Sequence, residues 1–412
     1  KDASIQPQYA HQVSITENQS VVSNVVPAST LAHITVYFEG GRRFEHEKNA
    51  GMTQLLMMCM LNGSEEKRKI KEKLENSGVR IEIENSADFF GLHFSVHPTL
   101  VEKVIPIIAK LIYHTEFTEN FINEQKLLLL KDQSAKLQEP FFRSVELFYQ
   151  SLFGVHGYGQ PRLGTAFSVL HIEPKHLAYA YTQDIAQSNS TLWIVTSPKK
   201  HEDIPLLVSQ HIPKNEKTIE ARAQLFSMFP KKQIKVTKDT HSENLHSVCM
   251  GLKTISIKDP RQHYLEIMQI YLSGSGGVLS DALVEKLNLV DTVKAYHVHL
   301  LQAGVFFIQL KSKQVQDASL FEYLQTIFTS LTKISPSHDA LDIAKELAIM
   351  GKKHRLQHAR ELSYDIGSRY FAGLPWEEPR LIEQNIRKTQ SDELTGMMGD
   401  VMDFDSFAMG IC

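Results

Sequence analysis

The sequence predicts an α+β fold made of two homologous domains, each an antiparallel sheet with helices packed on one face. Its 412 residues exceed the roughly 250 to 300 at which a single hydrophobic core stops growing, so two domains are expected. One order of strands and helices also occurs twice, with Gly91 and Gly304 opening matching strands. We therefore expect domains at 1–212 and 228–412, joined by a polar linker at 213–227.

The first half begins with an alternating strand at 33–38 and the turn Gly40-Gly41. A short apolar helix follows within 49–64, ended by the turn Asn62-Gly63-Ser64. Periodicity and glycine stops then predict a charged helix at 65–75, strands at 79–83 and 89–96, helices at 100–113, 119–136 and 141–153, and a closing strand at 191–195.

The second half repeats this order, which a duplicated unit explains most simply. Its predicted elements are a strand at 246–252, a helix at 262–272, a turn at 273–277, a helix at 279–287, strands at 294–299 and 305–310, and helices at 320–331, 338–354 and 356–371.

Composition excludes several classes of function. A net charge of −3 gives no field for nucleic acid, so no such partner is expected. Cys59, Cys249 and Cys412 fit neither a disulfide framework nor a zinc ribbon. The longest apolar runs, 55–61 and 127–130, are far below the roughly 18 residues that span a bilayer, so the protein is not expected to be integral to a membrane.

The apolar helix within 49–64 carries four Met, three Leu and one Cys, and no acidic, basic or imidazole side chain lies between Thr53 and Gly63. Methionine fills gaps in cores, so the helix is expected to serve packing. Around it lie the pieces GGRRFE at 40–45, Gly51, HGYGQP at 156–161 and Gly164-Thr165.

This arrangement, over nearly the whole chain, resembles the M16 metallopeptidases. That family includes the mitochondrial processing peptidase, the core proteins of the cytochrome bc1 complex and two-chain bacterial peptidases. The resemblance implies an M16/LuxS-like metallohydrolase fold in which the two domains form a clam.

In active members the helix after the glycine carries H-x-x-E-H, whose histidines bind zinc and whose Glu activates the zinc-bound water. Here Gln54 and Met58 stand at the His positions and Met57 at the Glu position. The third-ligand position falls on Asp132, and the accompanying acidic position on Gln125. An amide and thioethers bind zinc poorly and Met cannot take a proton, so the resemblance implies an inactive homologue with no metal or other cofactor.

The substrate-binding positions of the family are also changed. The Arg/Tyr pair expected in the second half falls on Val284 and Asp291. The edge strand that pairs with substrate, usually Asn-Ala, reads Glu82-Ile83.

The turn at 273–277 contains Gly274, Gly276 and Gly277 but lacks the P-loop and G-x-G-x-x-G patterns. We expect a plain turn. The alternative is a role in guiding substrate, as for the glycine-rich loop of the non-catalytic processing-peptidase subunit.

A replacement metal site has one local candidate. His354 and His358 are predicted one helical turn apart with Glu361 on the same face, but the many cationic neighbours favour a solvated surface. His297 and His299 share one side of a strand without a third ligand, so they are expected to be ordinary sheet residues.

These observations predict a non-catalytic subunit that pairs with an active H-x-x-E-H paralogue as a heterodimer, or forms a homodimer, and helps to enclose an extended peptide. The alternatives are a scaffold subunit like the bc1 core proteins, or a stand-alone peptide-binding protein. The chain starts at Lys1 without signal-peptide features, so any targeting peptide is expected to be absent from this sequence. We expect the bacterial periplasm, with the mitochondrial matrix or inner membrane as the alternative.

Overall fold

The structure is a computed structural model. It describes residues 12–16, 19–27, 29–113, 116–186, 190–201, 203–213, 235–238, 247–274, 276–286, 290–311, 317–330, 333, 335–375 and 379–412. The chain forms two compact units. The first is Lys1–Gln133, Arg162–Leu225 and His358–Gly373, and the second is Ser134–Pro161, Phe226–Gln357 and Leu374–Cys412. Most of the predicted linker at 213–227 lies outside the described residues.

The first unit is built on a six-stranded sheet with the order β1-β2-β6-β3-β5-β4. Its strands are β1 (Gln12–Thr16), β2 (Gln19–Val25), β3 (Ala32–Glu39), β4 (Arg80–Asn85), β5 (Phe89–Val96) and β6 (Thr191–Ser197). β2 and β6 run parallel, and the other pairs are antiparallel. The central strands β3, β5 and β6 are almost wholly buried, because helices cover both of their faces.

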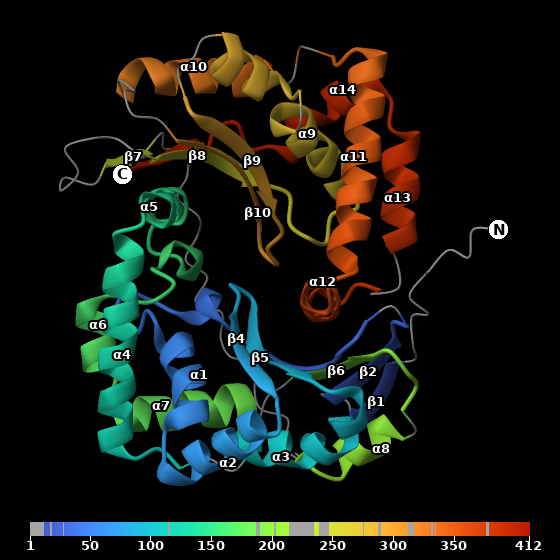
Figure 1. The fold of residues 1–412 in the computed structure, drawn as a ribbon. Coiled ribbons are helices and arrows are strands. Elements are labelled where there is room, and N and C mark those ends of the chain that lie inside the picture. The colour runs from blue at the N-terminus through green and yellow to red at the C-terminus, as the bar shows by residue number, and fades with distance from the viewer. Residues whose placement is uncertain are drawn as a thin grey trace. The chain divides into compact units, whose positions relative to one another are not determined.

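Most helices of the first unit lie on one face of this sheet, below it in Figure 1, and α12 lies on the other. The helices are η1 (Arg42–Phe44), α1 (Met52–Asn62), α2 (Glu65–Asn76), η2 (Pro98–Leu100), α3 (Val101–Tyr113), α4 (Glu119–Leu137), α6 (Ala166–His171), α7 (Pro174–Tyr181), η4 (Thr182–Ala186), α8 (Ile204–Ser209) and α12 (Ala359–Ala372).

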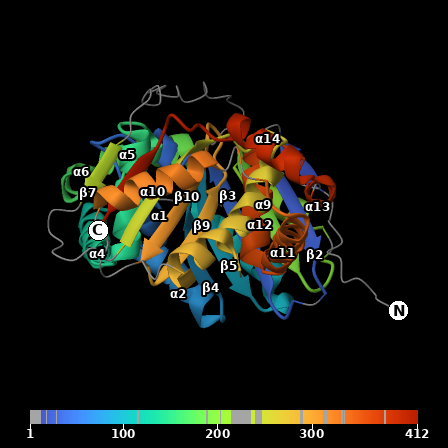
Figure 2. The same cartoon turned by 90° about the horizontal axis from the view of Figure 1, so that it is seen from above.

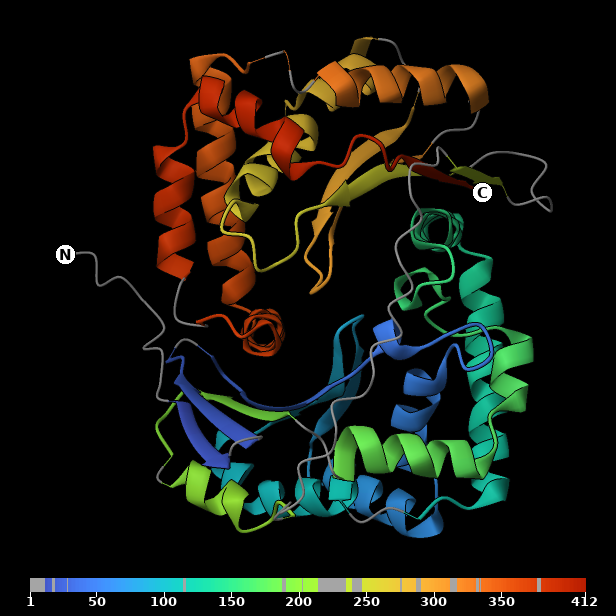
Figure 3. The ribbon, with the colours of Figure 1, turned by 180° about the vertical axis from the view of Figure 1, so that it is seen from behind.

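The second unit has a five-stranded sheet with the order β7-β11-β8-β10-β9. Its strands are β7 (Lys235–Lys238), β8 (Ser247–Thr254), β9 (Thr292–Val298), β10 (Gly304–Lys311) and β11 (Ala408–Ile411). Its helices are α5 (Pro140–Phe153), η3 (Gly157–Gly159), α9 (Gln262–Ser273), η5 (Ser280–Lys286), α10 (Asp317–Ser330), α11 (His338–Leu356), α13 (Pro379–Lys388) and α14 (Ser391–Val401). α11, α13 and α14 gather around α9, as Figure 2 shows, and α11 and α13 lie side by side again in Figure 3.

Apart from β1, the strands of the first sheet match those of the second sheet one for one. The order β2-β6-β3-β5-β4 matches β7-β11-β8-β10-β9, and the parallel pair occupies the same place in both. This confirms the predicted α+β fold and its duplication. The parallel pairs differ from the purely antiparallel sheets that were expected, because the closing strands β6 and β11 insert next to β2 and β7, respectively, in the same direction.

Each half of the chain gives one helix to the sheet of the other half. α5 packs on β7, β8 and β11, while α12 packs on β3, β5 and β6. The compact units therefore differ from the contiguous domains 1–212 and 228–412 by this exchange. The contact between α5 and β11 is close at Gly410, since an added Cβ there would overlap the backbone of Ser144 and Phe148 on α5.

Among the described residues, no helix is both long enough and apolar enough to cross a membrane.

Candidate functional site

The start of α1 is held by a buried carboxylate. Glu45 accepts hydrogen bonds from the backbone N–H groups of Gly51 and Thr53, both at 2.8 Å. Burial raises the pKa of Glu45, and its bonds to Thr53 and Gly51 oppose that shift. Two orphan N–H groups of the helix are thereby satisfied next to the positive end of its dipole.

Two of the motif glycines that are far apart in the sequence meet here. Gly51 has a φ of 86°, which favours glycine, and an added Cβ would overlap Gly164 and the Leu163 carbonyl. Ser168 on α6 donates a hydrogen bond of 2.7 Å to the carbonyl of Ala50. These contacts fix the start of α1 against the segment that leads into α6.

The predicted motif positions lie on α1, whose observed bounds confirm the expected helix. Met57, at the general-base position, is 0% exposed. Gln54 and Met58, at the ligand positions, are half-buried. The Gln54 side-chain oxygen accepts a hydrogen bond of 3.1 Å from the side chain of Asn85, at the end of β4. This contact connects the helix to the edge strand through neutral amides.

The two positions on α4 that are acidic in active members differ in their exposure here. Gln125 is 2% exposed, whereas Asp132 lies on the surface. Beside Gln125, the Lys126 side chain is 8% exposed and its ammonium donates a 3.3 Å hydrogen bond to the Leu170 carbonyl. Burial raises the pKa of Cys59 on α1 to about 12, and the nearby Lys126 charge opposes that rise. A buried cation therefore stands close to the helix that carries zinc in active members.

These residues do not fit a catalytic zinc ion, which needs three strong protein ligands and an open position. The general-base position is enclosed, and the one carboxylate, Asp132, is exposed. Among the residues that the structure describes, no group of three or more His, Cys, Asp or Glu side chains is arranged to hold a metal ion.

Glu82 and Ile83 lie half-buried on β4, the edge strand of the first sheet. Arg360 on α12 makes a charge-assisted bond to Glu84 at 2.8 Å and approaches Glu82 to 3.6 Å. Its pKa is raised, because the hydrogen bond and charge of Glu84 outweigh the lowering by burial. The exchanged helix therefore offsets the acidic charge that replaces the usual Asn-Ala.

The substrate-binding positions in the second unit are apolar or exposed. Val284, on η5, packs half-buried against the core of this unit, and Asp291 is exposed just before β9. Gly274 ends α9, and the Gly277 N–H donates to its carbonyl at 2.8 Å. Gly276 has a φ of 73°. These glycines form a turn between two helices, as expected.

The alternative metal cluster does not form one helical face. His354 lies in the last turn of α11, which ends at Leu356, and His358 precedes the first residue of α12. The chain turns between them, and His354 belongs to a different compact unit from His358 and Glu361. The predicted one-turn spacing was wrong because residues 357–358 break the helix.

Sequence reasoning missed Lys126, Arg360 and Asn85. Arg360 acts on a strand almost three hundred positions earlier, and no local pattern indicates that contact. Lys126 gave a weak signal, as a charged residue on the apolar face of a predicted helix.

Comparison with known proteins agrees with the duplicated fold. Residues 20–166 match the family Insulinase (Peptidase family M16), and residues 172–347 match the Peptidase M16 inactive domain. A Bacillus subtilis (strain 168) protein described as an uncharacterized zinc protease, YmxG, is 21% identical over 338 residues, covering 81% of this chain and 79% of its own length.

Two solved structures show the same fold. A protease from Helicobacter pylori has a TM-score of 0.87 at 14% identity, covering 98% of this chain and 99% of that one. A chain of Complex III2 from Candida albicans has a TM-score of 0.80 at 14% identity, with 99% and 95% covered. The two family matches follow one another along most of the sequence, and the chain belongs to peptidase family M16.

Proposed function

We propose that this chain is a non-catalytic M16 subunit that pairs with an active H-x-x-E-H paralogue to form the proteolytic chamber. One observation carries the proposal: Met57 stands at the general-base position and is 0% exposed, on a helix whose start is held by hydrogen bonds to Glu45 and Ser168. A side chain that cannot take a proton, packed away from water, cannot activate a nucleophile. The fold is thus retained for a purpose other than its own chemistry.

The subunit's contribution to substrate binding is assigned to the edge strand β4. An extended peptide can add to such an edge through main-chain hydrogen bonds. Such pairing would depend on main-chain groups, because Arg80 and Arg360 already pair with the carboxylates of Glu82 and Glu84.

A scaffold role is the second candidate, and the similarity to a chain of Complex III2 supports it. In that case the chain would assemble with other subunits, or with a second copy of itself, without any proteolysis. For the first candidate we place the pair in the bacterial periplasm, and fractionation of the native cell tests that placement. Recovery with mitochondrial matrix or inner-membrane proteins would favour the scaffold.

The test mixes this chain with an H-x-x-E-H paralogue from the same cell, each purified separately. We expect a one-to-one complex, with an interface on the order of 2,000 Å² or more if association is obligate. Peptide cleavage by the paralogue is expected to fall at least about tenfold when this chain is omitted, equivalent to roughly 1.4 kcal/mol in the barrier.

The matched control adds bovine serum albumin in place of this chain, which excludes non-specific stabilisation of the paralogue. A paralogue that is fully active alone and never co-elutes with this chain would overturn the pairing and leave the scaffold as the function.

A further inference from the structure

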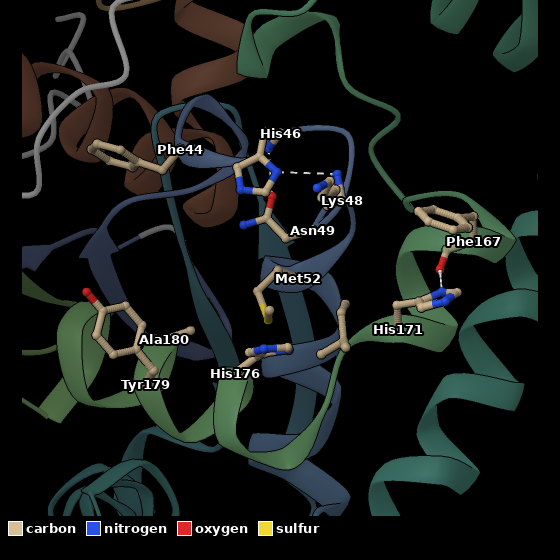
Figure 4. Close-up of a pocket in the computed structure, with 11 residues that line it drawn as sticks. Phe44, His46, Lys48, Asn49, Met52, Phe167, His171, His176, Tyr179 and Ala180 are labelled. Carbon is tan, nitrogen blue, oxygen red and sulfur yellow. Dashed lines mark hydrogen bonds between the residues drawn. The ribbon is translucent and has the colours of Figure 1, made fainter.

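An open cavity of about 670 Å³ lies within the first unit, between the start of α1 and the helices α6 and α7. Its volume is in the range of small-molecule sites. Figure 4 shows Met52, the first residue of α1, in the middle of the lining, with Phe44 and Tyr179 on one side and Phe167 and His171 on the other. The cavity is separate from the degenerate motif, whose base position Met57 is buried inside the unit.

The floor of the cavity is apolar. Met52, Ile172 and Ala180 are 8%, 1% and 2% exposed, so their side chains are fixed by the surrounding core. The walls are aromatic: Phe167 and Tyr179 remain 58% and 60% exposed. Exposed aromatic rings around a buried apolar floor offer a contact surface for a ring or a branched aliphatic chain.

The polar lining includes several hydrogen-bond donors, and the Asn49 side-chain oxygen already accepts a hydrogen bond of 2.7 Å from the His46 N–H. The Lys48 N–H donates to Nδ1 of His46 at 3.3 Å, and the Glu173 N–H donates to Nδ1 of His176 at 3.1 Å. In the neutral form, each of these rings must therefore carry its proton on Nε2, as a donor. The Lys48 side chain adds an ammonium group, and the described lining residues include no Asp or Glu.

We propose that this cavity binds a carboxylate attached to an aromatic or branched aliphatic group. The apolar part would rest on Met52 between the rings of Phe167 and Tyr179. The carboxylate would accept hydrogen bonds from Lys48 and His46, which lie on the same side of Met52 in Figure 4. Two sources share this chemistry: a peptide that ends in an apolar residue, and a free aryl or alkyl carboxylic acid. The site requires neither a paralogue nor peptidase activity, so it is independent of the proposed subunit role.

The experiment measures binding to the full chain by calorimetry with three probes: 3-phenylpropanoate, N-acetyl-Gly-Gly-Phe, and the C-terminal amide of the same peptide. We expect both acids to bind and the amide to bind at least about tenfold more weakly, because it has lost the charge that the donors recognise. If N-acetyl-Gly-Gly-Phe binds more tightly than 3-phenylpropanoate, the ligand is a peptide C-terminus. If the two acids bind equally, the ligand is a free carboxylic acid. Either outcome supports the site.

Two surface substitutions connect the binding to the cavity. Lys48→Gln is expected to weaken the acids about tenfold without changing the amide, and Phe167→Ala to weaken all three probes. Both positions are exposed, so the fold should be kept. The matched controls are Lys103→Gln on α3 and Leu170→Ala on α6, which are exposed and lie outside the lining.

Three outcomes would each overturn the proposal. The first is equal affinity of the peptide acid and its amide, and the second is unchanged affinity in both cavity variants. The third is no binding of any probe up to about 10 mM, which means a binding free energy weaker than roughly −2.7 kcal/mol.

Discussion

At the scale of the residue, α1 is held at its start by a buried carboxylate and carries neutral side chains at the positions of the family motif. Glu45 and Gly51 fix the start of α1, while Gln54, Met57 and Met58 occupy the positions of two ligands and a base. The sequence alone shows which residue types stand at these positions, because that depends on residue identity at a known spacing, and the inactivity that they imply stays a prediction. It could not reveal that Met57 is wholly enclosed or that Lys126 lies nearby, because both depend on packing between separate helices.

We predict that the inherited site holds no zinc. Gln54, Met57, Met58 and Asp132 supply one carboxylate, and that carboxylate is exposed. Metal analysis of protein purified without a histidine tag should give well under one equivalent of zinc. Stoichiometric zinc that is lost in the double variant His354→Ala and His358→Ala would instead assign a metal to those surface histidines.

Simple reversion is expected to cost stability without restoring activity. The four-fold variant combines Asp132→Glu on α4 with Gln54→His, Met57→Glu and Met58→His on α1. The changes on α1 place polar groups in a helix that packs around methionine, at about 1 to 3 kcal/mol for each unpaired buried group. Val284 and Asp291 would still replace the Arg/Tyr pair. Urea unfolding and a peptide-cleavage assay check both parts.

The matched control for this reversion is Asp132→Glu alone, which should leave stability unchanged because the position is exposed. Efficient cleavage by the four-fold variant on its own would show that the rest of an active site has survived.

At the scale of the element, the sequence could not predict which sheet α5 and α12 pack on. Periodicity located α5 and α12 to within a few residues, because it reports one apolar face of a helix. It does not identify the sheet that covers that face. Similarly, β2 and β6 pair in parallel across about 170 residues of intervening chain, and no local signal marks that pairing.

The close contact of α5 with β11 gives a direct test. Gly410→Ala should destabilise the protein by about 1 to 3 kcal/mol, because the new methyl group would overlap the backbone of Ser144 and Phe148. Gly399→Ala, on α14 with nothing within 4 Å of the added Cβ, is the control and should be neutral or stabilising. Equal effects of the two changes in urea unfolding would contradict the close packing of α5.

The contact between α12 and its sheet should be sensitive to acid. His93 hydrogen-bonds Thr35 at 2.8 Å, and Thr35 donates to Ser363 on α12 at 3.2 Å. Burial, then the charges of His33 and Arg360, lower the pKa of His93 from 6.5 to about 3. As the pH falls below 6.5, the unfolded chain binds a proton that the folded chain does not, so stability decreases until about pH 3.

His93→Gln should remove this part of the acid sensitivity, which amounts to about 1.4 kcal/mol per pH unit across that window. Comparing the free energy of unfolding at pH 7.5 and pH 4.5 measures it, with the exposed His211→Gln as the control. If His93→Gln loses as much stability on acidification as the native protein, His93 does not titrate as the structure implies.

At the scale of the whole molecule, a duplicated α+β chain of family M16 carries Gln54, Met57 and Met58 on the helix where the family motif is expected. Duplication could be predicted because the order of elements repeats along the sequence. Function is harder to predict than the fold, because the residues at the motif positions argue against peptidase activity and do not indicate another role. The partner must therefore be identified by experiment.

The most direct measurement uses the complex of this chain with its H-x-x-E-H paralogue and changes only the Glu of the paralogue's motif to Gln. If this chain contributes no catalysis, peptide cleavage by the complex should fall by at least about a hundredfold, equivalent to roughly 2.7 kcal/mol in the barrier. Cleavage that continues at the native rate would show that this chain has an active site of its own, and would contradict the account.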